Sequence, residues 1–205
     1  MTSTSPVRVG VVVFDGADEL DVVGPYAVLR SWVAHSSLHP EVVTVSADGR
    51  GVVLARGLKV VPDRSAADVT DLHVVIQPGG PGVRTLLRDR DHVAWLRETR
   101  RRTAVLAGVG SGTLVLAAAG ALAGRPVAAS RAWSDDLVRI EPSVLVDTEG
   151  RLVDDGDVLT AAGGASSTAA GLHLVGRLES EQVADAVRSD LGHPGRGPGV
   201  DVSGR

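Results

Sequence analysis

The sequence has 205 residues, which is enough for one α/β domain with a sizeable buried core. Its formal net charge of −4 gives no general attraction to nucleic acid or to an anionic membrane, so we expect neither as a partner. The absence of cysteine excludes disulfides, thiolate metal sites and covalent thiol chemistry. Residues 1–6 lack the basic and apolar regions of a secretion signal, and the apolar runs are too short to cross a bilayer. We therefore expect a cytoplasmic protein.

Short β-branched segments alternate with helical stretches along the first half of the chain. Residues 7–14 form a nearly continuous apolar run, which is typical of a strand buried on both faces of a parallel sheet. Gly24-Pro25 predicts the start of a helix, because proline is favoured at the first helical position. The remaining predictions are strands at residues 41–47 and 72–76, a hairpin of residues 52–54 and 59–61, and helical structure from residue 83 to about residue 102 with a break near Asp89.

The second half continues this alternation. A strand at residues 103–107 leads into a tight turn at residues 108–112, and an apolar, buried helix is predicted at residues 113–122. The pattern closes with strands at residues 144–146, 151–153 and 158–161 and with helices at residues 166–178 and 180–190. It predicts one domain over residues 7–190, a flexible segment at residues 1–6 and a disordered, Gly/Pro-rich tail at residues 191–205.

Strands that alternate with helices predict a single-domain α/β fold, with a mostly parallel sheet flanked by helices on both faces. In such sheets, ligands bind at the carboxyl ends of the strands. Predicted turns lie at such ends at residues 15–25, 78–82 and 108–112. We therefore expect the functional residues to lie in these turns.

Four segments, taken together, carry a family pattern. The first is VFDGADELDVVGP at residues 13–25, and the second is QPGGPG at residues 77–82. The third is VGSGTLVLAAAG at residues 109–120, and the fourth is TAAGGAS at residues 160–166. In order and spacing, they resemble the isonitrile-hydratase-like branch of the ThiJ/PfpI superfamily over roughly residues 7–190. The resemblance implies a flavodoxin-like sandwich and a homodimer.

The chain departs from the family pattern at the nucleophile elbow, the sharp turn between a strand and the following helix. Where the family has a cysteine, commonly followed by threonine, this sequence has Gly110 and Ser111. The family's histidine after the elbow helix is also missing, and Ser130 and Arg131 stand near its place. The acidic residue of the first turn is kept as Asp21. The resemblance implies that this carboxylate takes part in proton transfer.

Glycine suits the elbow for a physical reason. A non-glycine residue there costs about 1–3 kcal/mol of backbone strain, whereas glycine adopts the same dihedral angles freely. We therefore expect Gly110 to relieve strain and to leave a small void where the sulfur would lie, open to a larger substrate. The N–H groups of this turn, with those of Gly79 and Gly80, are expected to face an anion or a carbonyl oxygen as an oxyanion site.

Asp21 is the candidate catalytic residue. A partly apolar pocket would raise its pKa and make it a general acid or base. The alternative is a carboxylate that only stabilises a helix N-terminus. Asp18 and Glu19 are nearby competitors, and we expect them to be solvated turn residues.

The other candidate residues are expected to bind substrate rather than to react. Ser111 lies one residue past the elbow apex with no histidine base close in sequence, so a cap of the elbow helix or a hydrogen bond to ligand is favoured over a nucleophile. Gly79 and Gly80 either supply N–H groups to the pocket or only form a glycine turn. Trp133 either forms a wall of the pocket or packs in the core.

No metal or cofactor is expected. The histidines show no metal-ligand spacing, and His173 is interpreted as a core or capping residue. The glycine turns match neither a dinucleotide fingerprint nor a phosphate-binding loop.

These observations favour a cofactor-free enzyme for a small organic molecule, with Asp21 shuttling protons during a hydration, elimination, isomerisation or cyclisation. Isonitrile hydration itself is not expected, because the resemblance assigns that chemistry to the missing cysteine. The alternative is a small-molecule-binding or regulatory protein with a silent active site. Glyoxalase, deglycase and peptidase activities are disfavoured because they depend on the thiol.

Overall fold

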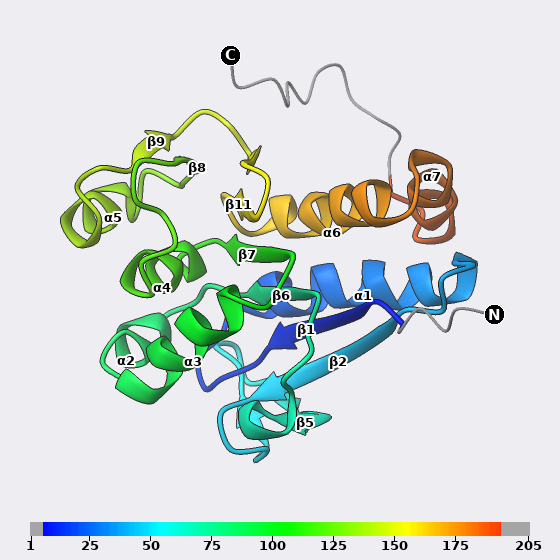
Figure 1. Cartoon of the computed structure of the whole chain (residues 1–205), viewed down its shortest axis with the longest axis horizontal. Helices are drawn as coiled ribbons and strands as arrows, with labels where there is room; N and C mark the ends of the chain where they lie inside the picture. Colours follow the sequence, from blue (N-terminus) through cyan, green and yellow to red (C-terminus); the bar gives the residue numbers. More distant parts are fainter. Residues whose placement is uncertain (1–5, 194–205) are drawn as a thin grey trace.

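A seven-stranded sheet forms the centre of the computed structural model, which describes residues 6–193 (Figure 1). Its strand order is β10-β11-β7-β6-β1-β2-β5, and only the edge pair β10–β11 is antiparallel. The mostly parallel sheet predicted from the sequence is therefore confirmed. The strands are β1 (Arg8–Val12), β2 (Glu41–Ser46), β5 (Arg64–Ser65), β6 (Val74–Gln77), β7 (Val105–Val109), β10 (Leu152–Asp154) and β11 (Val158–Ala161).

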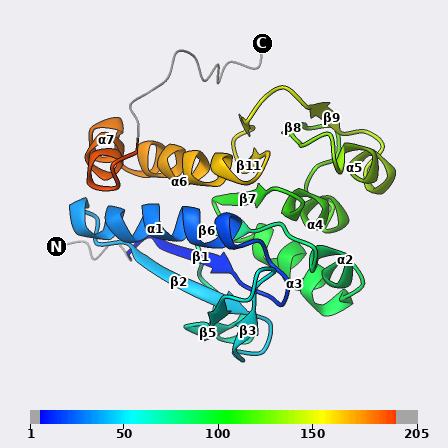
Figure 2. The ribbon, with the colours of Figure 1, turned by 180° about the vertical axis from the view of Figure 1, so that it is seen from behind.

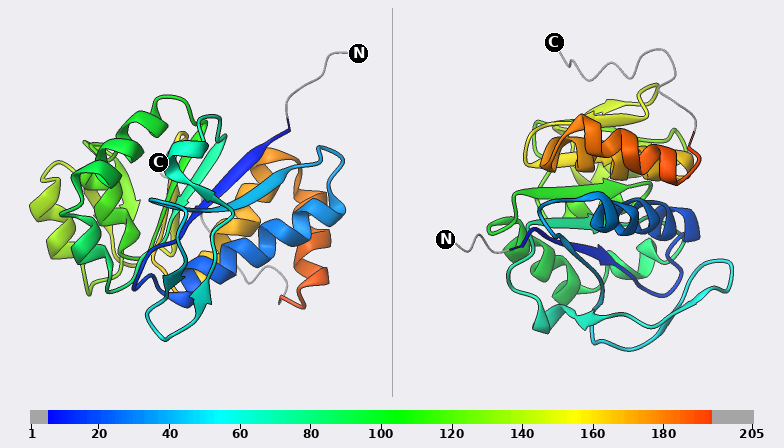
Figure 3. Two further views of the ribbon diagram at one scale, coloured as in Figure 1. Left: turned by 90° about the horizontal axis from the view of Figure 1, so that it is seen from below. Right: turned by 90° about the vertical axis from the view of Figure 1, so that its right-hand side faces the viewer.

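Helices cover both faces of the sheet. Helices α1 (Glu19–His35) and α6 (Ala165–Leu178) lie side by side, with α7 (Glu181–Asp190) against their ends (Figure 2). The other face carries α2 (Val83–Leu86), α3 (Arg90–Arg100) and α4 (Gly112–Ala118) (Figure 3, left). Because the sheet is covered on both sides, every residue of β6, β7 and β11 is buried, which explains their continuous apolar runs.

Two small sheets flank the large one. The predicted hairpin is confirmed as β3 (Val52–Val53) paired with β4 (Lys59–Val60), and β8 (Pro126–Ala128) pairs with β9 (Leu145–Asp147). Between β8 and β9 lies α5 (Ser134–Ile140), and a 3₁₀ turn, η1 (Ala66–Asp68), follows β5. The sequence did not predict β5, β8 or α5, because these elements are too short to show a clear apolar period.

Helix α1 begins at Glu19 and not at Gly24-Pro25, as the proline had suggested. Asp18 caps it, since its side chain accepts a hydrogen bond from the N–H of Leu20 at 3.0 Å. This carboxylate cap starts the helix earlier, and Pro25 then lies inside it at the loss of one backbone hydrogen bond. The earlier start places Asp21 in the first helical turn.

The elbow helix α4 is shorter than predicted. It ends at Ala118, and Gly120 follows with a positive φ of 75°, a conformation that closes helices. The predictions for residues 1–6 and 191–205 fall almost wholly outside the described residues. Within residues 6–193, no helix has the length and apolar character needed to cross a membrane.

Candidate functional site

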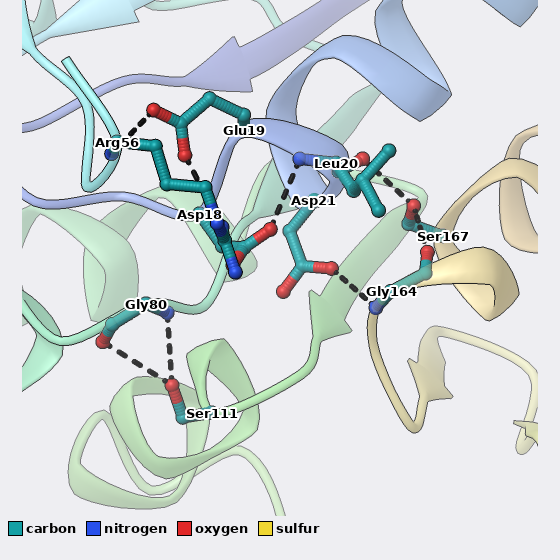
Figure 4. Close-up of polar contacts among 9 residues, drawn as sticks. All are labelled: Asp18, Glu19, Leu20, Asp21, Arg56, Gly80, Ser111, Gly164 and Ser167. Atoms are coloured by element: carbon teal, nitrogen blue, oxygen red, sulfur yellow. Dashed lines mark hydrogen bonds and ion pairs between the residues drawn. The ribbon is translucent and has the colours of Figure 1, made fainter. Parts of the chain in front are cut away.

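The candidate site lies where four parallel strands end. Asp21 projects from the first turn of α1, and Gly79 follows β6. Gly110 follows β7, and Gly163-Gly164 follow β11. Figure 4 shows Asp21 beside Gly164. The predicted turns at residues 15–25, 78–82 and 108–112 therefore meet at one edge of the sheet, as the general rule for such folds requires.

Asp21 is buried among glycines. Its side chain is 4% exposed, and Oδ1 accepts a hydrogen bond from the N–H of Gly164 at 2.8 Å (Figure 4). The second oxygen, Oδ2, faces three glycine Cα atoms: a Cβ placed on Gly79 would lie 2.9 Å from it, and one on Gly163 would lie 3.4 Å from it. A Cβ placed on Gly110 would overlap Oδ2 outright.

Gly110 has the left-handed backbone expected of an elbow, with φ at +56°. The expectation of glycine at a strained turn is therefore confirmed, since L-residues rarely adopt this conformation. The expected void is wrong. Asp21 Oδ2 lies too close to the ideal Cβ position of residue 110 for a side chain there, because glycine at the apex lets the carboxylate approach the backbone. No larger space for substrate follows from the missing thiol.

Burial raises the pKa of Asp21 to about 6 from its ordinary value of 3.8. Loss of water around the carboxylate is the main cause, and the negative charge of Asp18 adds to it. The N–H groups of Gly164 and Gly79 and the charge of Arg56 act in the opposite direction. A carboxyl group with such a pKa populates both protonation states near neutral pH.

Three N–H groups of the elbow and of the turn after β6 are engaged within the protein. Gly110 donates its N–H to the carbonyl oxygen of Ala161 at 2.9 Å. Gly80 donates its N–H to Ser111 Oγ at 3.0 Å (Figure 4). The N–H of Gly79 donates a hydrogen bond that lowers the pKa of Asp21. The N–H groups of Gly79, Gly80 and Gly110 are therefore engaged within the protein, and the function of these turns as an oxyanion site stays a prediction.

Ser111 stands at the N-cap position of α4, but its side chain makes no capping hydrogen bond. It binds the Gly80 turn instead. This contact fixes the distance between the turns after β6 and β7.

Asp18 and Glu19 are not the solvated residues that the sequence suggested. Arg56 Nη1 lies 2.7 Å from Asp18 Oδ2, and the N–H of Arg56 donates to Glu19 Oε1 at 2.5 Å (Figure 4). The carbonyl oxygen of Val53, in the same hairpin, also accepts a hydrogen bond from the N–H of Gly16. The β3–β4 hairpin therefore holds the turn that precedes Asp21.

The remaining candidates lie outside this cluster. Trp133 stands at the start of α5, half-buried against the core, and its function as a pocket wall stays a prediction. His173 pairs with Asp154 at 2.6 Å, which supports a structural function for this histidine. Over residues 6–193, no group of three or more acidic or histidine side chains is arranged to hold a metal ion.

Sequence reasoning missed a buried polar pair beneath the Gly79 turn. His92 Nε2 lies 2.9 Å from Gln77 Oε1, and Gln77 Nε2 donates to the carbonyl oxygen of Pro78 at 3.1 Å. Burial lowers the pKa of His92 to about 4, so the ring is neutral. The pair fixes the end of β6, and no sequence spacing indicates it.

Sequence reasoning also missed the closing turn of the site. Gly163 and Gly164 have φ values of +95° and +59°, and Ser167 Oγ donates to the carbonyl oxygen of Leu20 at 2.8 Å. The adjacent glycines directly after a buried strand were the available signal, since such turns place N–H groups at the strand end.

A covered parallel sheet, with a left-handed elbow facing a buried carboxylate, defines a flavodoxin-like α/β protein with an elbow site. The model of the DJ-1/PfpI family matches residues 7–176, and the chain belongs to this family. The resemblance inferred from the four segments is thereby confirmed.

Individual relatives differ in their named functions. Isonitrile hydratase of Pseudomonas putida is 29% identical over 185 residues, which cover 90% of this chain and 78% of that protein. The HTH-type transcriptional regulator GbdR of Pseudomonas aeruginosa is 30% identical over 70% of this chain, but the match spans only 39% of the regulator.

Solved structures show the same fold. A ThiJ/PfpI family protein from Pseudomonas syringae has a TM-score of 0.84 at 25% identity, covering 98% of this chain and 80% of that one. Drosophila melanogaster DJ-1beta has a TM-score of 0.81 at 22% identity, covering 93% of this chain and 100% of that one.

Proposed function

We propose that this protein is a cofactor-free enzyme of the hydratase, lyase or isomerase type, in which Asp21 is the general acid and base. The observation that carries the proposal is the buried carboxylate at the strand ends, with its pKa raised to about 6. Similarity to isonitrile hydratase supports a small organic substrate. Isonitrile hydration is not carried over, because the chain has no cysteine.

The ionised Asp21 takes a proton, through Oδ2, from the bound substrate or from a water molecule that attacks it. The N–H of Gly164 remains on Oδ1 and fixes the orientation of the carboxylate. The protonated Asp21 then returns the proton to the product, so that no covalent intermediate and no net change of the enzyme result. Ser111 and the Gly79–Gly80 turn are proposed to contact the substrate beside Gly110, with Trp133 as a wall.

We also propose that the protein works as a homodimer, as is common in the family. The oligomeric state in solution, measured by light scattering, tests this part. The cytoplasmic location stays a prediction from the sequence.

The test compares wild type with Asp21→Asn, each screened for conversion of a library of small polar molecules that includes isonitriles. Asp135→Asn is the matched control, because it makes the same substitution in the first turn of exposed helix α5. We expect a substrate that wild type and the control convert and that Asp21→Asn converts at least a hundredfold more slowly. Equal conversion by Asp21→Asn would exclude Asp21 as the acid–base group.

The second candidate function is a silent, ligand-binding regulatory protein, and similarity to the regulator GbdR favours it. In that case, wild type and Asp21→Asn would bind the same ligand with equal affinity, and neither would convert it. Mass spectrometry of the ligand after long incubation separates this outcome from slow turnover.

A further inference from the structure

A cavity of about 520 Å³ opens beside the turn between β11 and α6. Three segments form its walls: residues 129–131 after β8, residues 148–151 between β9 and β10, and the two sides of the Gly163-Gly164 turn. The lining residues are Ala129, Ser130, Arg131, Thr148, Glu149, Gly150, Arg151, Ala162 and Ser166. A volume of this size holds a small organic molecule.

The cavity carries an excess of positive charge. Arg131 forms an exposed ion pair with Glu149, which leaves one uncompensated charge on Arg151 among the charged residues of the lining. Within the described part of the chain, the side chain of Arg151 makes no hydrogen bond or ion pair. A free guanidinium has donor geometry that matches a carboxylate with two parallel hydrogen bonds.

Ser166 supplies a second polar group on the opposite wall. Its side chain is only 7% exposed, yet among residues 6–193 the hydroxyl has no hydrogen-bond partner. Ser166 also lies in the first turn of α6, a helix of 14 residues whose N-terminal end carries partial positive charge. Because Ser166 lines the cavity and its hydroxyl makes no hydrogen bond within residues 6–193, this hydroxyl is available to a bound molecule.

The cavity adjoins the Asp21 site through one short turn. Ala162 and Ser166 line the cavity and flank Gly163-Gly164, and Gly164 donates its N–H to Asp21 Oδ1. A molecule in the cavity therefore rests on the same turn that holds the candidate catalytic carboxylate.

We propose that this cavity binds a monocarboxylate, with Arg151 and Ser166 as its hydrogen-bond partners. The single excess positive charge fits one carboxylate better than a doubly charged phosphate. The binding claim stands on the cavity alone. The further claim that the carboxylate belongs to the substrate rests on the proposed function of Asp21.

Benzoate is a suitable probe, and benzamide is its uncharged counterpart. Amide chemical shifts of ¹⁵N-labelled protein are followed while each compound is added to wild type, Arg151→Gln, Ser166→Ala and Arg102→Gln. Arg102 is an exposed arginine before β7, at the opposite end of the sheet, and so provides the control.

We expect benzoate to shift the amides of residues 130–131, 148–151 and 162–166 and benzamide to have little effect. Arg151→Gln should weaken benzoate binding at least fivefold, Ser166→Ala at least twofold, and Arg102→Gln should not change it. Equal binding of benzamide, shifts elsewhere on the protein or undiminished binding by Arg151→Gln would overturn the proposal.

Asp21→Asn separates this proposal from the catalytic one. Benzoate binding retained by Asp21→Asn, with no compound turned over by wild type, removes the catalytic proposal and leaves the carboxylate site intact. Turnover by wild type of neutral compounds only, with no binding of benzoate, removes the carboxylate site and leaves Asp21 as the acid–base group.

Discussion

Asp21 and Gly110 meet at the elbow: the Oδ2 atom of Asp21 lies too close to the ideal Cβ position of residue 110 for a side chain to fit there. The two residues are 89 positions apart in the chain and meet because α1 and the turn after β7 lie at the same edge of the sheet. A side chain at residue 110 and the present carboxylate position exclude each other. The present position of the carboxylate therefore requires glycine at residue 110.

Substitution of Gly110 by alanine tests this exclusion. We expect Gly110→Ala to lower the free energy of unfolding by more than the roughly 1–3 kcal/mol that a strained φ alone costs, because its Cβ also displaces Asp21. Gly156→Ala is the control, since Gly156 has a φ of +80° and open space around it. Urea denaturation measures both. Equal losses in the two variants would show that the carboxylate moves aside freely.

The pKa of Asp21 predicts a pH-dependent stability. Because the pKa is about 6 in the folded protein and 3.8 in the unfolded chain, the folded state holds a proton that the unfolded state has lost between these values. Stability from this group therefore falls as the pH rises through that window. Asp21→Asn removes the effect, so the variant should be more stable than wild type at pH 8, by up to about 3 kcal/mol.

The same comparison at low pH gives the control for Asp21. Below pH 3.8 the carboxyl group is protonated in both states, and the stability gain should disappear. Thermal unfolding at pH 8 and at pH 3.5 measures the two differences. A gain that is the same at both pH values would contradict the raised pKa.

For His92, we expect stability to change with pH in the opposite direction. Its pKa is lowered from 6.5 to about 4 by burial, so the unfolded chain binds a proton in this range that the folded protein does not. Stability from this group is lost as the pH falls from 6.5 towards 4. His92→Gln should therefore gain stability relative to wild type on acidification through this range. A constant difference between the two proteins over this range would show that the ring is not held neutral.

Ser111→Ala removes the acceptor for the Gly80 N–H. We expect a loss of about 1–3 kcal/mol in the free energy of unfolding, because this N–H is then left without a partner. Turnover of any identified substrate should fall by less than about tenfold, since Ser111 is proposed to hold the turn and to contact the substrate but not to transfer a proton. A loss beyond about a thousandfold in a folded variant would instead identify Ser111 as a nucleophile.

Glu179 lies far from the site, and we expect its substitution to lower the free energy of unfolding. Its carboxylate accepts hydrogen bonds from Trp32 Nε1 at 2.6 Å and from Ser36 Oγ at 2.5 Å. Burial raises the pKa of Glu179, but these hydrogen bonds and those of Ser37 lower it more, so the net pKa lies below its ordinary value.

Glu179→Gln should cost about 1.5–3 kcal/mol at pH 7, since these bonds involve a charged acceptor. The cost should shrink as the pH falls through the lowered pKa, because protonation weakens the wild type as well. Unfolding followed by tryptophan fluorescence at pH 7 and pH 3 measures it. A cost that does not vary with pH would mean that charge contributes nothing at this residue.

The sequence predicted the central sheet well, because buried strands such as β6 and β7 are continuous apolar runs. It also predicted the break at Asp89, whose side chain caps α3 by accepting from the N–H groups of Asp91 and His92. It failed for β8 and α5, which are too short to carry such a pattern. It also failed at Pro25, where the Asp18 cap outweighs the proline signal.

The site was predicted in part. Asp21, Gly79, Gly110 and Ser111 were all expected at strand ends, and the structure brings them together. The position of the Asp21 carboxylate was not predictable, because it depends on how closely α1 packs against the elbow. The same holds for the partner Gly164, whose contact depends on the packing of α1 against α6.

The hydrogen bond from Gly164 to Asp21 joins residues 143 positions apart. During synthesis, a ribosome adding about 5–20 residues per second makes Gly164 about 7–30 seconds after Asp21. The nascent chain gains first the carboxylate and then the elbow, but it lacks the donor that holds Oδ1 until Gly164 is added. The site is therefore among the last parts of the protein to be completed, and a chain released before residue 164 cannot assemble it.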